Sequence, residues 1–433
     1  MARFGPAGPL RGSLRPPADK SISHRAALIG AMAEGPTVVE DYLNSADTRS
    51  TLAAVTALGA RVEGFSDDRI ERRISIDGVG LRGARPAEID VGNAGTLLRL
   101  LPGWLAGQEG GAWCLDGDDS IRRRPVDRIA DPLRRMGASL SCREERLPPL
   151  RIEGSPLSGI EYELPVASAQ VKSCLLFAGL LAEGETRVVE PAPSRDHSER
   201  MLAAAGAEVG RDGDVVTVSP ATALEPGEIT VPGDFSAAAF FIVAATIVPG
   251  SDLVLTGVGL NPTRTGLLEI LDRMGASVEV EDADLGAEPG GTLRVGAAEL
   301  RGTEVGGAEV PLAIDELPLV ALAACFAEGE TTIREAEELR RKESDRIATV
   351  SEALSGLGAD VEATADGLVV RGGGGLRGGT VSSHGDHRIA MMGAVAGLSS
   401  REGVEVEGMD AAAISYPGFE ADLAALAGGA RTG

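Results

Sequence analysis

The chain contains few residues that commonly form disulfides or bind metals. Among its 433 residues there are four cysteines and four histidines. The cysteines form no C-x-x-C pair, and the two that lie in alanine- and leucine-rich runs are expected to be small buried hydrophobic residues. His384 and His387 have a metal-like spacing, but no further set of ligands accompanies them. The sequence therefore predicts a protein of a reducing compartment, the cytoplasm, without a metal site.

Long hydrophobic runs are also missing. No uninterrupted apolar stretch approaches the roughly 18 residues that a membrane-spanning helix needs. The N-terminus carries Arg3 and Arg11 but lacks the apolar segment of a signal peptide. We expect neither secretion nor insertion into a membrane.

Positive charge is scarce. The 41 Lys and Arg residues face 65 Asp and Glu residues, which gives a formal net charge of −24. Long-range repulsion disfavours nucleic acids and anionic membranes as partners. Any anionic ligand must therefore be held by local clusters of cations.

An internal repeat organises the chain. A helical pattern that ends in Gly-Ala recurs every 69 to 83 residues, with its glycine at Gly59, Gly137, Gly206, Gly275, Gly358 and, more weakly, Gly429. Glycine favours the left-handed conformation that often ends a helix. Between these markers lies a second, more apolar helix that leads into a strand. Each copy is thus predicted to contain an apolar helix, a strand, an amphipathic helix and two strands.

Six such copies predict an α/β fold with two domains of three copies each. Helices that are apolar nearly all round, such as 236–248, must be buried, and mixed β-sheets are expected around them. We place the first domain at 15–233 and the second at 1–14 and 234–433. The sixth copy lacks its final strands, and we expect the N-terminal segment 9–14 to fill that gap. The chain would then cross twice between domains, beside a cleft.

Charged and polar residues cluster where the helices are predicted to begin. The stretch from Asp19 to Arg25 precedes an apolar helix, and unpaired backbone N–H groups with the helix dipole favour an anion there. The alternative is a serine N-cap with solvated neighbours. The repetition of the arrangement favours the anion site. Comparable groups are Asn93-Ala94-Gly95-Thr96, Arg122-Arg123-Arg124-Pro125, Ser168-Ala169-Gln170, Ser194-Arg195-Asp196-His197, Asn261-Pro262-Thr263-Arg264, Asp315-Glu316, Arg341 to Arg346 and Asp386-His387-Arg388.

A pocket this cationic predicts a ligand with more than one anionic group. Asp315 and Glu343 stand within the same set, where carboxylates would weaken the binding of an anion. Proton transfer is the use that we favour for both. The alternative is that Glu343 and Asp345 pair with Arg341 and Arg346 along an exposed helix, which would stabilise that helix only slightly.

At these residues the sequence resembles the 5-enolpyruvylshikimate-3-phosphate synthase (3-phosphoshikimate 1-carboxyvinyltransferase) family, over essentially the whole chain. The motifs that carry the resemblance are Asp19 to Arg25, Gly92-Asn93-Ala94-Gly95-Thr96, Gly117 to Pro125, Ala167 to Ser173, Ile314-Asp315-Glu316, Glu338 to Arg346 and Asp386 to Met391. The family's fold has two domains of three such copies, which agrees with the repeat. The resemblance implies transfer of the enolpyruvyl group of phosphoenolpyruvate to the 5-hydroxyl of shikimate 3-phosphate, with release of phosphate, in aromatic amino-acid biosynthesis.

The resemblance also implies the roles of individual residues. Shikimate 3-phosphate would be bound by Lys20, Ser21, Arg25, Ser168, Ala169, Gln170, Arg195, Asp315 and Lys342. Phosphoenolpyruvate would be bound by Lys20, Asn93, Gly95, Thr96, Arg124, Gln170, Arg346 and Arg388. Asp315 would remove the proton of the 5-hydroxyl, Glu343 would protonate the methylene carbon, and Lys20 would touch both substrates. No cofactor is implied, and a monomer is expected.

One departure from the family and two rival functions stay open at this point. Some members carry a C-terminal lysine that contacts phosphoenolpyruvate, where this chain has Ile414. The sister transferase that acts on a UDP-amino sugar has a Lys-Asn pair in place of Lys20-Ser21. A non-catalytic protein that binds anionic metabolites would need the cations but neither Asp315 nor Glu343.

Overall fold

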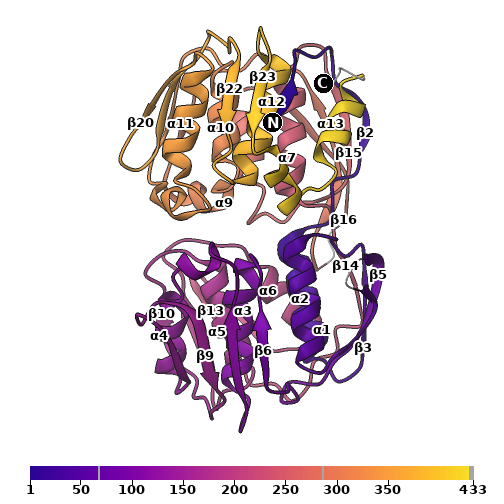
Figure 1. Ribbon diagram of the computed structural model, residues 1–433, viewed down its shortest axis with the longest axis vertical. Helices are drawn as coiled ribbons and strands as arrows, with labels where there is room; N and C mark the ends of the chain where they lie inside the picture. Colours follow the sequence, from indigo (N-terminus) through magenta and orange to yellow (C-terminus); the bar gives the residue numbers. More distant parts are fainter. Residues whose placement is uncertain (67–68, 285–286, 429–433) are drawn as a thin grey trace. The chain divides into compact units, whose positions relative to one another are not determined.

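The computed structural model describes residues 1–66, 69–284 and 287–428. The chain divides into two compact units. The 18–231 unit is Ala18–Val231, and the 232–433 unit is Pro232–Gly433 together with Met1–Pro17 (Figure 1). Buried apolar side chains form two separate clusters, one in each unit, so each unit has its own hydrophobic core. The weak sixth marker, Gly429-Ala430, lies outside the described residues.

The 18–231 unit contains the predicted helix–strand–helix–strand–strand order three times. Its first copy is α1 (Lys20–Met32), β3 (Pro36–Glu40), α2 (Ala46–Ala57), β4 (Arg61–Ser66) and β5 (Arg69–Asp77). The second is β6 (Ala87–Asp90), α3 (Gly95–Ala106), β7 (Ala112–Asp116), η1 (Ile121–Arg123), α4 (Asp127–Arg135), β8 (Ser139–Arg143) and β9 (Leu147–Glu153). The third is β10 (Glu161–Glu163), α5 (Ala169–Gly179), β11 (Thr186–Val189), α6 (His197–Ala204), β12 (Val209–Asp212) and β13 (Val215–Val218), followed by β14 (Glu228–Thr230).

The 232–433 unit repeats this order. It begins with β1 (Ala2–Phe4) and β2 (Arg11–Leu14), and continues after the first unit with α7 (Phe235–Ile247), β15 (Asp252–Gly259), α8 (Gly266–Arg273), β16 (Ser277–Asp284) and β17 (Gly290–Gly296). Next come β18 (Glu304–Val305), η2 (Gly307–Glu309), α9 (Val310–Ala313), α10 (Leu317–Ala324), β19 (Glu330–Ile333), η3 (Glu337–Arg341), α11 (Arg346–Gly356), β20 (Asp360–Ala363) and β21 (Leu368–Arg371). The last copy is β22 (Gly379–Ser382), α12 (His387–Ser399), β23 (Val404–Glu407), η4 (Met409–Ile414) and α13 (Phe419–Leu426).

The glycines that mark the helix ends adopt the conformation that the sequence predicts. Gly59, Gly137, Gly206, Gly275 and Gly358 have φ values from +90° to +107°. A side chain at these positions would be strained, which explains why glycine follows the amphipathic helix in each of these copies.

The sheets are small and mixed. In the first, ordered β14-β3-β5-β4, the strand after the apolar helix pairs in parallel with β14 and antiparallel with β5. The sheets β6-β7-β9-β8, β10-β11-β13-β12 and β18-β19-β21-β20 follow the same plan. The predicted α/β class with mixed sheets is confirmed.

The N-terminal segment does complete the last sheet, but the prediction that residues 9–14 do so is wrong. Residues 9–14 do not complete the last copy, because β2 pairs in parallel with β15 of the fourth copy. The three-residue strand β1 pairs antiparallel with β23 and completes the last sheet instead. A strand this short carries too little hydrophobic alternation to be recognised in the sequence.

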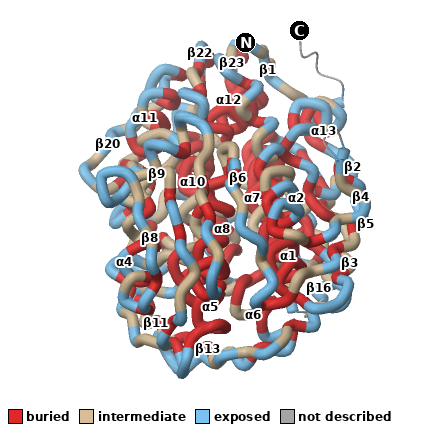
Figure 2. Tube along the Cα trace, turned by 60° about the horizontal axis from the view of Figure 1, so that its bottom comes forward, coloured by how far each residue is buried: buried red, intermediate tan, exposed pale blue. Residues whose placement is uncertain are grey.

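The apolar helices form the interior of each unit, as their composition predicts. Every residue of α7 is buried, and α7 contacts both α10 and α12. Figure 2 shows the buried residues gathered along α1, α5, α7 and α10. No helix in the described part of the chain is long and apolar enough to cross a membrane.

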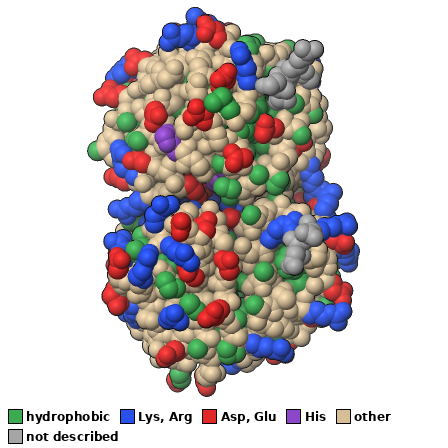
Figure 3. All heavy atoms as spheres, viewed as in Figure 1, with side chains coloured by type: hydrophobic (Ala, Val, Ile, Leu, Met, Phe, Trp, Pro, Cys, Tyr) green, Lys and Arg blue, Asp and Glu red, His purple; other side chains and the backbone are tan. Residues whose placement is uncertain are grey.

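Charged side chains of both signs are dispersed over the surface visible in Figure 3, and hydrophobic side chains lie scattered between them. Among the described residues, the large hydrophobic side chains that are exposed are Met1, Val166 and Val280. Three separate exposed residues form no extended apolar face.

Candidate active site

The 18–231 unit places its first predicted cations at the start of α1. Asp19 caps this helix by accepting a hydrogen bond from the Ile22 backbone N–H at 2.9 Å. The Lys20 ammonium donates to Asp47 Oδ2, also at 2.9 Å. The alternative of a serine cap with solvated neighbours is therefore wrong, because an aspartate is the cap and Arg25 is only 2% exposed.

Arg25 is held in a fixed orientation by three oxygen atoms. Its Nε donates to Ser198 Oγ at 2.8 Å, its Nη2 to Ser173 Oγ at 2.9 Å and its Nη1 to the Ser21 carbonyl at 3.0 Å. A buried guanidinium with such partners is a rigid donor for a carboxylate or a phosphate.

The beginnings of α3 and α5 meet through side chains from both predicted motifs. Gln170 Nε2 donates to Thr96 Oγ1 at 3.2 Å, and Gln170 Oε1 accepts from Arg99 Nη1 at 2.8 Å. Ser168 caps α5 by accepting from the Val171 N–H at 3.4 Å. Since Ser173 of α5 also holds Arg25, the first two turns of α5 connect three of the predicted motifs.

Arg124 lies beside the start of α3. Its Nη2 donates to Asn93 Oδ1 at 3.0 Å and to Ser120 Oγ at 3.3 Å. A Cβ atom at Gly95 would come within 2.8 Å of Arg124 Nη1. Glycine at this position therefore leaves room for the guanidinium, and Asn93, Gly95 and Arg124 form one group.

Arg195 lies on the segment 190–196, which connects β11 to α6. The residue is half-buried. Asp196 follows it at the start of α6 and accepts a hydrogen bond from Arg200 Nε at 2.8 Å. Ser198, in the first turn of α6, is a partner of Arg25, so this segment and Arg25 share the contact between α5 and α6.

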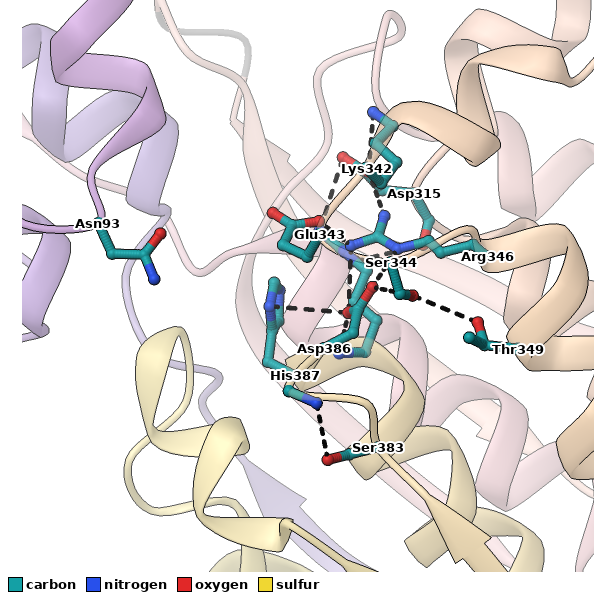
Figure 4. A network of polar contacts seen from close by, with 12 residues as sticks. Asn93, Asp315, Lys342, Glu343, Ser344, Arg346, Thr349, Ser383, Asp386 and His387 are labelled. Carbon is teal, nitrogen blue, oxygen red and sulfur yellow. Dashed lines mark hydrogen bonds and ion pairs between the residues drawn. The ribbon is translucent and has the colours of Figure 1, made fainter. Parts of the chain in front are cut away.

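The 232–433 unit gathers its predicted residues around Arg346. This guanidinium is 1% exposed, and it donates to Asp315 Oδ1 at 3.1 Å, Glu343 Oε2 at 2.6 Å and Asp386 Oδ2 at 2.8 Å. Figure 4 shows these carboxylates converging on it from different segments. Three carboxylates around one buried arginine form a strongly coupled cluster.

The charges of this cluster shift the pKa values of Arg346 and Asp386. Burial by itself would lower the pKa of Arg346, but Glu343, Asp386 and Asp315 together raise it above the ordinary value. Burial opposes ionisation of Asp386, yet Arg346 lowers the pKa of Asp386 below its ordinary range. Both groups are therefore charged at neutral pH.

Asp315 has two further cationic neighbours. Lys342 Nζ lies 3.4 Å from Asp315 Oδ1, and Arg388 Nη2 lies 3.6 Å from Asp315 Oδ2. Lys342 is 22% exposed and Arg388 12%, so both retain limited access to solvent. The 232–433 unit thus brings Asp315, Lys342, Glu343, Arg346 and Arg388 together.

The alternative for Glu343 and Asp345 is wrong for Asp345 and incomplete for Glu343. Asp345 pairs with Arg340 Nη1 at 2.7 Å and caps α11 through the Ala348 N–H. Glu343 does pair with Arg346, but this arginine is buried and shared with Asp315 and Asp386. Glu343 itself is 30% exposed, so its carboxyl group lies at the edge of the cluster.

Two acidic residues of these clusters were missed as site residues in the sequence. Asp47 holds Lys20 from α2, and Asp386 holds Arg346 from the cap of α12. The sequence indicated a role for Asp386 only weakly, through its position directly before a predicted apolar helix. Nothing in the sequence indicated a role for Asp47, since Asp47 and Lys20 are 27 positions apart in the chain and no local pattern connects them.

Ile414 lies at the end of η4, and its side chain cannot donate a hydrogen bond to an anion. The C-terminal lysine contact of some relatives is therefore not available from this residue. Among the residues that the structure describes, no group of three or more His, Cys, Asp and Glu side chains is arranged to hold a metal ion.

Buried helices, small mixed sheets and clustered cations at helix starts define an enolpyruvyl transferase-like protein. The model of the family "EPSP synthase (3-phosphoshikimate 1-carboxyvinyltransferase)" matches residues 5–423. A 3-phosphoshikimate 1-carboxyvinyltransferase of Synechococcus sp. (strain JA-3-3Ab) is 51% identical over 422 residues, which cover 96% of this chain and 94% of that protein. The protein of the same name from Methylococcus capsulatus is 50% identical over 419 residues, with the same coverage of both chains.

Solved structures give the same result. The EPSP synthase of Acinetobacter baumannii, at 2.37 Å, has a TM-score of 0.88 and 42% identity, and the match covers 98% of both chains. The enolpyruvyl transferase NikO of Streptomyces tendae has a TM-score of 0.78 over 98% of this chain and 97% of its own, and at 19% identity it supports the fold alone. This chain belongs to the EPSP synthase family, and it is a transferase of the shikimate pathway. The resemblance read from the sequence is confirmed.

Proposed function

We propose that the residues gathered in the two units act on one pair of substrates, shikimate 3-phosphate and phosphoenolpyruvate. Shikimate 3-phosphate would be held by Lys20, Ser21, Arg25, Ser168, Ala169, Gln170, Arg195, Asp315 and Lys342. Phosphoenolpyruvate would be held by Lys20, Asn93, Gly95, Thr96, Arg124, Gln170, Arg346 and Arg388. The family supports the reaction, and the contacts within each unit support the assignment of residues.

The observation that carries the proposal is the position of Asp315 among three cations. Three cations, Lys342, Arg346 and Arg388, lie 3.1 to 3.6 Å from its oxygen atoms. Such neighbours keep a carboxylate ionised and weaken it as a base. Anionic substrates compete for the same cations, and their binding would free Asp315 to accept a proton.

The chemistry assigned to this chain requires three proton transfers. Asp315 removes the proton of the 5-hydroxyl group while the hydroxyl oxygen of shikimate 3-phosphate attacks C2 of phosphoenolpyruvate. Glu343 protonates the methylene carbon of phosphoenolpyruvate. In the tetrahedral intermediate the C2 carbon carries both the new ether oxygen and the phosphate. When the phosphate leaves, Glu343 takes back a proton from the methyl carbon and the enol double bond is restored.

The reaction is tested by measuring phosphate release. The protein is incubated with phosphoenolpyruvate and either shikimate 3-phosphate or UDP-N-acetylglucosamine. We expect phosphate release with shikimate 3-phosphate. Release with the UDP sugar alone would favour the sister transferase, and release with neither would favour a binding protein.

The role of Glu343 is tested by Glu343→Gln, which keeps the shape of the side chain but removes the acid. We expect turnover to fall by ~10²-fold or more, the usual scale of general acid–base catalysis, while both substrates still bind. Steady-state rates and calorimetric binding measure the two effects. Glu352→Gln is the matched control, because Glu352 is 66% exposed and lies on the adjacent helix α11. A Glu343→Gln enzyme as active as this control would refute the role.

Three further expectations remain predictions. The net charge of −24 supports a protein that does not bind nucleic acid. A cytoplasmic location is supported by the biosynthetic family, and a monomer is expected in solution. Sedimentation of the purified protein measures the last of these.

A further inference from the structure

Lys172 is a buried cation to which the proposed chemistry gives no role. Its side chain is fully buried, in the first turn of α5. Taking an ammonium group out of water is strongly unfavourable unless well-placed opposite charges surround it. Its Nζ lies 2.9 Å from Glu190 Oε2 and 2.6 Å from Glu199 Oε1, and it donates to the Ser194 carbonyl at 3.4 Å.

These three partners all come from one stretch of chain. Glu190 directly follows β11, Ser194 lies in the middle of the segment 190–196, and Glu199 lies in the first turn of α6. The Ser194 hydroxyl also donates to Glu190 Oε1 at 2.5 Å, a hydrogen bond within the segment 190–196. Lys172 on α5 thus contacts the connection between β11 and α6 at both of its ends and in its middle, and holds it against α5.

The fastened segment carries a residue of the candidate active site. Arg195 directly follows Ser194, whose carbonyl accepts the hydrogen bond from Lys172. Ser198, in the same turn of α6 as Glu199, accepts from Arg25 Nε at 2.8 Å and donates to Ser173 Oγ at 2.6 Å. Ser173 is the neighbour of Lys172 on α5, so the contact that Lys172 maintains also orients Arg25.

The charges of the cluster depend on Lys172. Glu190 has a second partner, Arg211 Nη1, at 3.1 Å. Burial raises the pKa of Glu199 above its ordinary value, although Lys172 opposes this shift. Without the ammonium group, Glu190 would keep Arg211 as its cation, but Glu199 would lose the cation that lies 2.6 Å from its carboxylate. Hydration of the carboxylates would then favour opening of the segment.

We propose that Lys172 is a positioning residue for the phosphorylated substrate: it holds the segment 190–196 on α5, so that Arg195, and through Ser198 also Arg25, are fixed for binding. The inference rests on the proposed function, because it assumes that these two arginines bind shikimate 3-phosphate. It predicts a defect confined to that substrate.

The test uses the full chain and the double variant Lys172→Met/Glu199→Gln. This change removes one cation and one anion and leaves Glu190 paired with Arg211, so no additional unpaired charge is buried. We expect the KM for shikimate 3-phosphate to rise by about tenfold, the effect of losing one well-placed ionic contact. The KM for phosphoenolpyruvate and kcat at saturating substrate should stay within about threefold, well short of that tenfold change. Lys172→Arg keeps the charge and should restore most of the affinity.

Arg82→Met is the control, because Arg82 is another cation of the 18–231 unit, but an exposed one whose guanidinium joins two helices through backbone carbonyls. It donates to the Gly107 and Leu181 carbonyls, at the opposite ends of α3 and α5 from the active-site motifs. We expect this variant to be less stable with unchanged KM values. If the double variant does not fold, Ser194→Ala provides the test. It removes the hydrogen bond from the Ser194 hydroxyl to Glu190 but keeps the contacts of Lys172, so we expect a smaller rise, about threefold, in the KM for shikimate 3-phosphate.

Wild-type turnover is measured first, and its absence would refute the proposed function and not the positioning role. With an active wild type, an unchanged KM for shikimate 3-phosphate in the folded variant would overturn the inference. Equal changes in both KM values, or changes matched by Arg82→Met, would also overturn it, because they would indicate a purely structural role.

Discussion

At the scale of single residues, His24 makes the stability of the protein depend on pH. The imidazole is fully buried on α1, and its Nδ1 lies 2.6 Å from Thr51 Oγ1. Burial lowers the pKa of His24 to about 3; Asp47 opposes this shift, whereas Lys20 and Arg25 add to it. An unfolded chain binds this proton at about pH 6.5. Stability is therefore complete above pH 6.5 and is lost as the pH falls toward 3.

We predict that His24→Asn removes this loss. Between pH 7.5 and pH 5, acidification should reduce the free energy of unfolding of the wild type by about 2 kcal/mol more than that of the variant. Urea unfolding at a series of pH values measures the difference. His384→Asn is the control, because the His384 side chain is 41% exposed, and it should follow the wild type. Identical pH dependence in wild type and His24→Asn would contradict the prediction.

The sequence predicted the cations of the site better than their acidic partners. Lys20, Arg25, Arg124, Lys342 and Arg388 stand out because positive charge is scarce and recurs at helix starts. A capping aspartate such as Asp386 looks like any other N-cap, and its second bond to Arg346 exists only in the folded chain. Side-chain partners that are distant in sequence leave no local pattern.

At the scale of helices and strands, local pattern predicted much more. The apolar helices were identified because a helix without a polar face must be buried, as α7 is throughout. Strand partners were harder to predict, since pairing is a contact between distant segments. The error at residues 9–14 is of this kind: the strand was recognised, but its partner is β15 and not the last copy.

The packing of α3 on α5 gives a prediction at this scale. A Cβ atom at Gly103 would lie 2.0 Å from the Cys174 carbonyl oxygen, so Gly103→Ala must push the two helices apart. We expect a loss of about 1–3 kcal/mol in the free energy of unfolding, the usual cost of overpacking. Gly356→Ala is the control, because no atom lies within 4 Å of its added Cβ and alanine favours a helix by about 1 kcal/mol. Chemical unfolding of both variants measures the effect, and equal stability would show that the helices can adjust.

At the scale of the whole molecule, the two units differ in how the chain builds them. The 18–231 unit is continuous and contains one of the two cores. The 232–433 unit is discontinuous, because β1 pairs with β23 and β2 pairs with β15. Phe4 and Leu10, which precede the first crossing of the chain, are 3% and 0% exposed. The N-terminal segment therefore belongs structurally to residues that follow it by more than two hundred positions.

This difference predicts different behaviour of the separated units. A fragment of residues 18–231 should fold cooperatively and bind shikimate 3-phosphate, but it should release no phosphate, because Asp315 and Glu343 are missing. Circular dichroism, calorimetry and the phosphate assay measure these three properties.

A fragment of residues 232–433 should fold poorly, because two strand edges and the pockets for Phe4 and Leu10 are left open to water. Adding a peptide of residues 1–17 supplies both strands, and it should restore a compact, cooperatively unfolding state in size-exclusion and circular dichroism experiments. A peptide with Phe4→Asp and Leu10→Asp is the matched control, since it keeps the backbone donors and acceptors but cannot fill the pockets. If the 232–433 fragment folds equally well with no peptide, the N-terminal segment contributes little to that core, and the discontinuity of the unit has no energetic consequence.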